Sequence, residues 1–215
     1  MGATRLLGRL AGADLRVFTT ADAAHLGEAS VGAACQTLRR LAASGLLARL
    51  KRGVWANLLA KDLHPFEAVP FLAAPWPAYV SLHSALNYRG LLDQVPLATF
   101  AVTAGKPARF ETPLGPFSFH RIRADLFGGF VWESVGRGRF PVAQAEKAIF
   151  DALYLGRRGV AGASLFPELD LEGGFSRDRF REFLRRADDP LLVAEARRRG
   201  LLGATRRASP RAAPV

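Results

Sequence analysis

The sequence predicts an α+β protein in two parts. Residues 19–58 contain two short helical segments followed by two strand-like segments that meet at a glycine turn, which is the element order of a winged helix-turn-helix. Residues 99–135 contain segments with the aromatic and β-branched composition of strands, and helical spacing returns after residue 141. We therefore expect an N-terminal winged helix-turn-helix domain and a C-terminal mixed α/β domain that contains a small antiparallel sheet.

The N-terminal domain should begin with two short helices. Residues 4–11 form an amphipathic pattern, and residues 17–18 can start a strand. A second helix is expected over residues 21–26, because the Thr20 hydroxyl can cap a free backbone N–H at its start. Gly27 then ends it.

A third helix should run from a Ser30 cap to Ser44, since its apolar residues recur at a spacing close to a helical turn. This predicted core stripe consists of Val31, Ala34, Cys35, Leu38, Leu41 and Ala42. The opposite face carries small residues, which permit close approach, and side chains able to bond base edges or phosphates. That face comprises Ala33, Gln36, Thr37 and Arg40.

A basic hairpin is predicted directly after this helix. Strands over residues 46–50 and 54–58 would be joined at Lys51-Arg52-Gly53, where cations can neutralise phosphates or reach into the minor groove. Double-stranded DNA is therefore the expected partner. The predicted DNA-binding residues are Ser30, Ala33, Gln36, Thr37, Arg39, Arg40, Arg49, Lys51 and Arg52. The alternative is a small helical domain with a surface charge run.

The charge balance favours a polyanionic partner. The formal net charge is +11, and residues 1–60 hold 8 Lys/Arg against 3 Asp/Glu, a contribution of +5. An Arg-rich and Ala-rich composition can also reflect genome bias. The single Cys35 excludes an internal disulfide, and no apolar run or signal-peptide pattern suggests a membrane or secreted protein. We expect a cytoplasmic protein with no membrane association.

The second domain is predicted to begin after a polar link at residues 61–65. A helix over residues 66–74 would end at Pro75-Trp76-Pro77, and a second would run from a Ser81 cap to Gly90. A helix over residues 141–155 should pack on the sheet with Glu146, Lys147 and Asp151 off its apolar stripe. The expected strands are residues 99–103, 109–112, 117–122 and 130–135.

Two charged helices should close the fold. They cover residues 177–187, capped by Ser176, and residues 191–199, capped by Asp189 with a proline at the first position. The predicted boundaries are thus 1–60 for the DNA-binding domain and 64–200 for the C-terminal domain. Residues 201–215 are expected to form a basic disordered tail.

The sequence contains no constellation that predicts an enzyme, a metal site or a cofactor. Its four histidines are scattered singly, and the glycines at 136 and 138 indicate a plain turn and no dinucleotide-binding loop. Lys147 and Asp151 are four residues apart and predict an ordinary ion pair, which would contribute only a few tenths of a kcal/mol if exposed. A nuclease or nucleotidyltransferase remains an alternative only if Glu146 and Asp151 converge with other carboxylates in space.

Residues 15–160 resemble AbiEi-type antitoxins of type IV toxin–antitoxin (abortive infection) systems. The resemblance rests on Val17-Phe18-Thr19-Thr20, on residues 46–55 (LLARLKRGVW), on residues 79–86 (YVSLHSAL) with Gly90-Leu91, and on residues 146–154 (EKAIFDALY). The family often has Tyr at the wing where this chain has Trp55. It commonly has proline before the Glu-Lys-Ala motif, where this chain has Ala145.

The resemblance implies a winged helix joined to an antitoxin domain. It implies repression of the protein's own operon through inverted repeats, and action against a nucleotidyltransferase-like toxin without a requirement for a stable complex. The antitoxin surface that it suggests consists of Ser81, Ser84, Tyr88, Glu146, Lys147, Asp151 and Tyr154. A winged-helix regulator without a toxin partner is the alternative in the same class.

Overall fold

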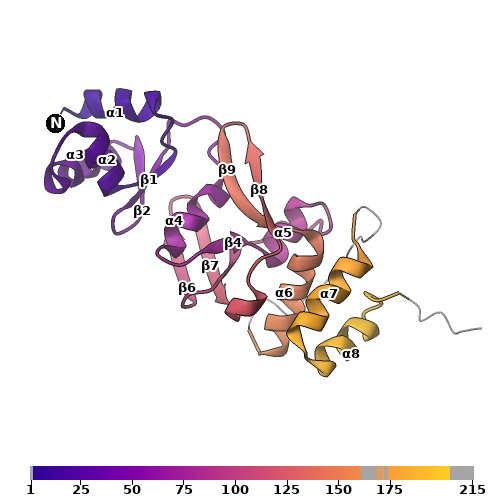
Figure 1. Ribbon diagram of the computed structural model, residues 1–215. Coiled ribbons are helices and arrows are strands. Elements are labelled where there is room, and N and C mark those ends of the chain that lie inside the picture. Colours follow the sequence, from indigo (N-terminus) through magenta and orange to yellow (C-terminus); the bar gives the residue numbers. More distant parts are fainter. Residues whose placement is uncertain (1, 161–168, 170, 172–173, 204–215) are drawn as a thin grey trace, which may run out of the picture.

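The computed structural model describes residues 2–160, 169, 171 and 174–203 (Figure 1). Its first part packs three helices against one face of a three-stranded antiparallel sheet of order β1-β3-β2. The elements are α1 (Ala3–Gly12), β1 (Val17–Thr19), α2 (Thr20–Gly27), α3 (Val31–Ala43), β2 (Leu47–Lys51) and β3 (Val54–Asn57). We call these residues, 3–57, the N-terminal domain.

The start of α2 differs from the prediction by one residue. Thr19 is the cap: its hydroxyl accepts a hydrogen bond from the Asp22 amide, and the Asp22 carboxylate accepts one from the Thr19 amide. Thr20 has a different role, because its hydroxyl oxygen accepts a hydrogen bond of 2.9 Å from Trp55 Nε1. This bond ties β3 to the first turn of α2. The Ser30 cap of α3 is confirmed by a bond of 3.3 Å from the Ala33 amide.

The two faces of the three-stranded sheet are both buried, but against different partners. Phe18, Leu47 and Trp55 face the helices and form one core with Leu10 and Leu38. The opposite face packs on the second part of the chain through Val17, Ala48, Leu50, Val54 and Ala56. Residues of a strand alternate between faces, so a single set of three short strands serves two cores.

The second part, residues 64–203, contains a six-stranded mixed sheet of order β6-β7-β5-β4-β9-β8 (Figure 1). The prediction of a small antiparallel sheet is therefore wrong, since β5 pairs with β7 and β4 with β9 in parallel. The strands are β4 (Ala78–Val80), β5 (Thr99–Thr103), β6 (Ala108–Thr112), β7 (Gly115–Arg121), β8 (Phe130–Val135) and β9 (Gly138–Ala143). Strands β4 and β9 were missed: β4 lies directly before the predicted Ser81 cap, and the predicted helix over residues 141–155 included the last three residues of β9.

The helices of the second domain match the predicted positions except for the start of α6 and for η2, which was not predicted. They are η1 (Pro65–Ala68), α4 (Val69–Ala73), α5 (Leu82–Tyr88), η2 (Ala124–Leu126), α6 (Ala145–Arg157), α7 (Arg177–Ala187) and α8 (Pro190–Arg198). Helix α6 begins four residues later than expected, because residues 141–143 complete β9. Ser81 precedes α5 but makes no capping bond. The caps Ser176 and Asp189 are confirmed.

A buried ion pair joins the two domains across the predicted link. Arg16 donates to both carboxylate oxygens of Glu67, at 2.7 and 3.0 Å, and to the carbonyl oxygens of Lys61 and Asp62, each at 2.7 Å. The bonds to Glu67 raise the pKa of the Arg16 guanidinium. With the shared apolar face, this pair fixes how the domains sit against each other.

The C-terminal end differs in part from the predicted tail. Leu201, its first residue, is 3 % exposed and belongs to the core of the second domain. The remainder of the tail, residues 204–215, lies outside the described residues. Within the described part of the chain, no helix is long and apolar enough to cross a membrane.

Candidate nucleic-acid interface

The exposed face of α3 differs from the predicted one by a partial rotation of the helix. Ala34, Leu38 and Leu41 are buried, and the face that remains in solvent comprises Gly32, Gln36, Arg39, Arg40 and Ala43. Val31 was expected in the core but is 58 % exposed at the first turn. Thus α3 presents an amide, two guanidinium groups and small residues outward, a set able to contact base edges and phosphates.

Three of the predicted DNA-binding residues, Ser30, Ala33 and Thr37, are not part of this exposed face. Thr37 is 5 % exposed, and its hydroxyl donates to the Ala33 carbonyl at 3.1 Å, so it is not available to DNA. Ala33 is half-buried, whereas Ser30 is exposed at the cap position. Thr37 was misplaced because a helical wheel does not show which residues of the helix its neighbouring elements cover.

The β2–β3 hairpin splits its three predicted cations between two environments. Arg49 is exposed, with its guanidinium carbon 5.9 Å from the centre of the Trp55 ring, and Arg52 is exposed at the turn. Lys51 instead points into the second domain, where Nζ donates to the carbonyls of Leu72 at 2.9 Å and Ala74 at 3.4 Å. Burial lowers the pKa of Lys51. The prediction that Lys51 contacts phosphate is therefore wrong.

The acidic residues of the N-terminal domain are all engaged by other groups. Asp22 closes the α2 capping box, Glu28 pairs with Arg9 at 2.9 Å, and Asp14 pairs with Arg137 at 2.9 Å. Among the described residues, none forms an ion pair with the cations of α3 or the hairpin tip. Of the described cations in α3 and the hairpin, the exposed ones are Arg39, Arg40, Arg49 and Arg52, and none of them has a carboxylate partner.

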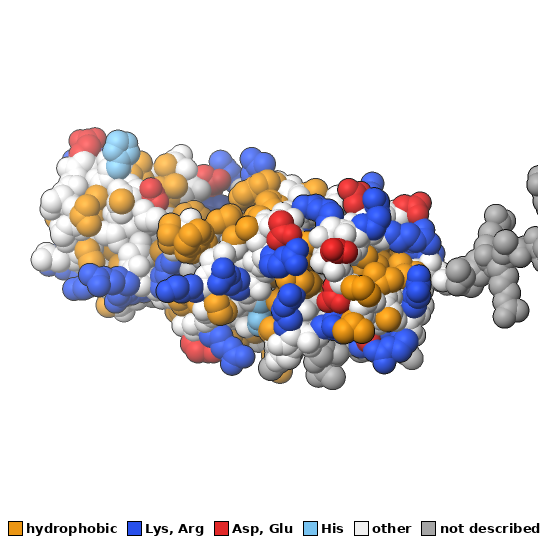
Figure 2. Space-filling view, turned by 60° about the horizontal axis from the view of Figure 1, so that its bottom comes forward, with side chains coloured by type: hydrophobic (Ala, Val, Ile, Leu, Met, Phe, Trp, Pro, Cys, Tyr) orange, Lys and Arg blue, Asp and Glu red, His pale blue; other side chains and the backbone are white. Residues whose placement is uncertain are grey.

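Lys and Arg side chains gather along one side of the molecule. Figure 2 shows them in a row that starts on the N-terminal domain and continues over the second domain. A surface of this kind attracts a polyanion by long-range electrostatics and gains affinity by releasing its counterions.

The residues suggested as an antitoxin surface are nearly all buried. Lys147 and Asp151 are both 0 % exposed and form an ion pair of 2.6 Å. The Asp151 carboxylate also accepts hydrogen bonds from the hydroxyls of Tyr79 at 2.9 Å and Ser81 at 2.8 Å. Burial raises the pKa of Asp151 and lowers that of Lys147. This cluster links β4, the start of α5 and α6 inside the domain.

The other members of that suggested surface are also held inside or at its edge. Ser84 donates to the Ala98 carbonyl at 3.1 Å, and the Glu146 carboxylate accepts from the Ser176 amide at 2.7 Å. Tyr154 is 4 % exposed and stacks on Phe150. Only Tyr88 is half-exposed. The proposal that these seven residues form a binding surface is therefore wrong, because all of them except Tyr88 are buried.

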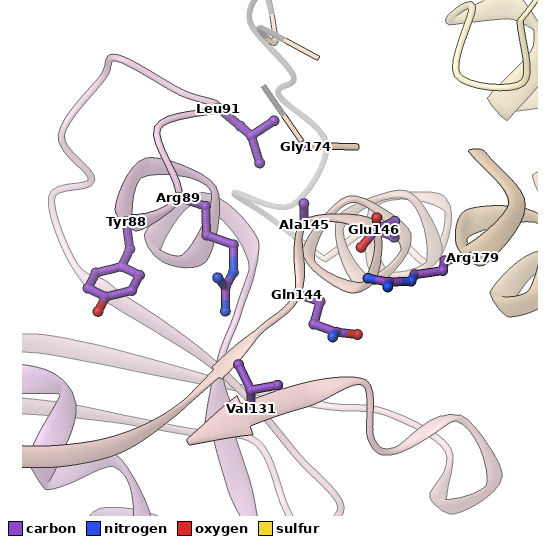
Figure 3. Close-up of a pocket in the computed structure, with 9 residues that line it drawn as sticks. All are labelled: Tyr88, Arg89, Leu91, Val131, Gln144, Ala145, Glu146, Gly174 and Arg179. Atoms are coloured by element: carbon purple, nitrogen blue, oxygen red, sulfur yellow. The ribbon is translucent and has the colours of Figure 1, made fainter. Parts of the chain in front are cut away.

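Tyr88 and Glu146 do reach a common hollow. A pocket of about 290 Å³ lies between the end of α5 and the start of α6, and Figure 3 shows Arg89, Gln144 and Arg179 around it. The Arg89 guanidinium is engaged with Glu133 at 3.1 Å and with the Ala143 carbonyl at 2.6 Å. No three His, Cys, Asp or Glu side chains of the described residues converge as a metal-binding group.

One comparison with known proteins bears on the N-terminal domain. Residues 6–57 match a family model described as "Transcriptional regulator, AbiEi antitoxin". The resemblance to AbiEi-type antitoxins is thereby confirmed for this domain. The matched segment runs from α1 to the end of β3 and includes both the exposed face of α3 and the hairpin. A search of curated proteins gave no match.

Proposed function

We propose that this protein is a DNA-binding transcriptional repressor that acts as the antitoxin of a type IV toxin–antitoxin system. The N-terminal domain would serve as a winged helix-turn-helix, with α3 as the recognition helix and the β2–β3 hairpin as the wing. The observation that carries the proposal is the exposed α3 face: Gln36, Arg39 and Arg40 stand outward, and among the described residues no carboxylate forms an ion pair with either arginine. The family match over residues 6–57 supports the same conclusion.

The division of labour on DNA follows from the chemistry of these side chains. Gln36 can pair with the edge of adenine, and arginine with that of guanine, in the major groove. Arg49 and Arg52 on the hairpin would bind phosphates, which fixes register without reading sequence. The natural target would be the protein's own operator, arranged as inverted repeats.

Binding to labelled duplex DNA at several salt concentrations tests this proposal. Gln36→Ala and Arg40→Ala should each cost about 1–3 kcal/mol on the operator and much less on random DNA. Arg197→Ala is the control, because Arg197 is exposed on α8 at the other end of the molecule (Figure 1). Equal losses on both DNAs for Gln36→Ala would show that α3 does not read bases.

The antitoxin role needs a separate experiment. Expression of the chain together with a nucleotidyltransferase-like toxin from the same operon should restore growth. Rescue by the Arg39→Ala/Arg40→Ala variant would show that neutralisation does not require DNA binding. Loss of rescue in that variant would show that neutralisation works through repression, and no rescue by the wild type would favour a regulator without a toxin.

A further inference from the structure

Trp76 is a large aromatic residue that the fold leaves half in solvent. It lies between α4 and β4, flanked by Pro75 and Pro77, and its side chain is 55 % exposed. Its amide donates to the Ala73 carbonyl at 3.1 Å, so the turn itself is hydrogen-bonded. Tryptophan usually buries most of its apolar surface. Packing within the domain therefore does not account for a Trp76 ring that is half exposed.

The Trp76 ring packs against the backbone of Gly105. A Cβ at Gly105 would lie 2.4 Å from Cγ and Cδ1 of Trp76, so only glycine permits this contact. Gly105 is not in the left-handed backbone region, which means that the ring, and not the turn, requires glycine. The Thr103 hydroxyl donates to the Pro77 carbonyl at 2.9 Å and accepts from the Gly105 amide at 3.1 Å. These bonds hold the Trp76 turn and the Gly105 turn together.

The turn that carries Trp76 lies beside the β2–β3 hairpin of the N-terminal domain. Lys51 Nζ bonds the carbonyl of Ala74, two residues before Trp76, and that of Leu72. Arg52 follows Lys51 and is exposed at the turn. In Figure 2, hydrophobic side chains lie between the two domains next to the row of Lys and Arg side chains. The Lys51 bonds thus hold the segment that leads to Trp76 against the hairpin whose turn carries Arg52.

We propose that Trp76 is a DNA-contacting residue that the second domain adds to the hairpin. The ring would lie against sugars or base edges at the minor groove beside the phosphates that Arg52 binds, as apolar side chains do in minor-groove proteins. The proposal rests on the proposed function and extends the DNA interface beyond residues 6–57. Because the contact is apolar, it adds affinity without releasing counterions.

Trp132 provides a matched control, because it is 54 % exposed on β8 of the same domain. Trp76→Ala should weaken binding to duplex DNA roughly tenfold while leaving the salt slope unchanged, and Trp76→Phe should lose less. Trp132→Ala should bind within about twofold of wild type. Gly105→Ala should reproduce part of the loss, since it displaces the ring without removing it.

A fluorescence measurement reports on the same contact without depending on a loss-of-binding variant. The chain has three tryptophans and Trp55 is 1 % exposed, so Trp76 dominates acrylamide quenching in a Trp132→Phe background. Saturating duplex DNA should reduce that quenching. Unchanged quenching with DNA bound, or equal affinities for Trp76→Ala and Trp132→Ala, overturns the inference. Loss of toxin neutralisation with unchanged DNA affinity would assign Trp76 to a protein partner and overturn it too.

The two proposals fail in distinguishable ways. If the wild-type chain shows no salt-dependent binding to duplex DNA, the proposed function fails, and the Trp76 contact fails with it. The second outcome is that the wild type binds DNA, the α3 variants lose affinity, and the Trp76 variants bind as tightly as the wild type. In that case the DNA-binding function stands and the Trp76 contact does not. Thermal unfolding of each variant confirms that any loss occurs in folded protein.

Discussion

Helices α3 and α6 have the same length, 13 residues, and nearly opposite environments. In α3, three apolar side chains face the core while Arg39 and Arg40 extend into solvent. In α6, every residue from Ala145 to Leu155 is buried, and that includes Glu146, Lys147 and Asp151. Both were read from the sequence as amphipathic helices, α3 with small and polar residues on its outer face and α6 with charged residues off its apolar stripe.

The difference lies in what covers the polar face. The polar face of α3 meets no other element of the described chain. Around α6 the sheet, α5, α7 and α8 all make contact, so its charges must satisfy each other inside the domain. Lys147 accordingly bonds Asp151 and the Leu126 carbonyl, and lies 4.7 Å from the Phe150 ring centre. Charge on α3 is free for a ligand, whereas charge on α6 holds the fold together.

The largest expected effect comes from breaking the α6 pair. Asp151→Asn should destabilise the protein by about 3–5 kcal/mol, because it leaves Lys147 as a buried charge without its counter-ion. Urea unfolding of the full chain measures this loss. Arg39→Ala on α3 is the control and should change stability by no more than about 0.5 kcal/mol. If the two variants unfold at the same urea concentration, the contrast between the helices is wrong.

The second-largest loss of stability is expected from breaking the Arg16–Glu67 ion pair between the domains. Glu67→Gln removes the charge facing Arg16 but leaves its two bonds to the Lys61 and Asp62 carbonyls, so the loss should be about 1–3 kcal/mol. The comparison variant is Glu133→Gln, whose pair with Arg89 is about one third exposed; we expect at most about 1 kcal/mol there. If Glu67→Gln unfolds at the same urea concentration as the wild type, the Arg16–Glu67 pair does not hold the domains together.

Adjacent residues on the hairpin allow a finer test of exposed against internal charge. Arg52→Gln should reduce the slope of log affinity against log salt by about 0.9, the value for one lost phosphate contact on duplex DNA. Lys51→Gln should leave the slope unchanged, because its ammonium group bonds α4 carbonyls. Any loss of affinity in that variant would come from a displaced hairpin. Equal changes in slope would place Lys51 on the DNA.

The smallest expected effect is a loss of stability at acidic pH that is caused by His120. His120 is 7 % exposed and lies 3.0 Å from the Ser118 hydroxyl, and burial lowers its pKa. A histidine with a lowered folded-state pKa stabilises the protein above its unfolded value, about 6.5, and this stabilisation is lost as pH falls through the folded value. Wild-type stability should therefore decline from pH 7 to pH 5. His120→Gln should flatten that decline, which urea unfolding of both proteins at pH 7 and pH 5 measures.

Local chemistry explains why much of the chain could be placed before the structure. Ser30, Ser176 and Asp189 cap helices as predicted, because each needs only its own hydroxyl or carboxylate and amides two or three residues ahead. Strands β5 and β8 have the predicted bounds for a similar reason: their composition and flanking turns are local. Errors of a single residue, such as Thr20 for Thr19, arise where two adjacent hydroxyls are equally suitable.

The sequence by itself determined the positions of most helices, including α3 and most of its outward side chains, because helix periodicity and capping depend on near neighbours. Tertiary structure decided the fate of Lys51 and Lys147, the pairing of β4 with β9, and the exposure of Trp76. Each of these depends on segments at least 20 residues apart. Whether a charged side chain meets water or another element is settled only when the chain folds, since periodicity shows which residues share a face but not what covers it.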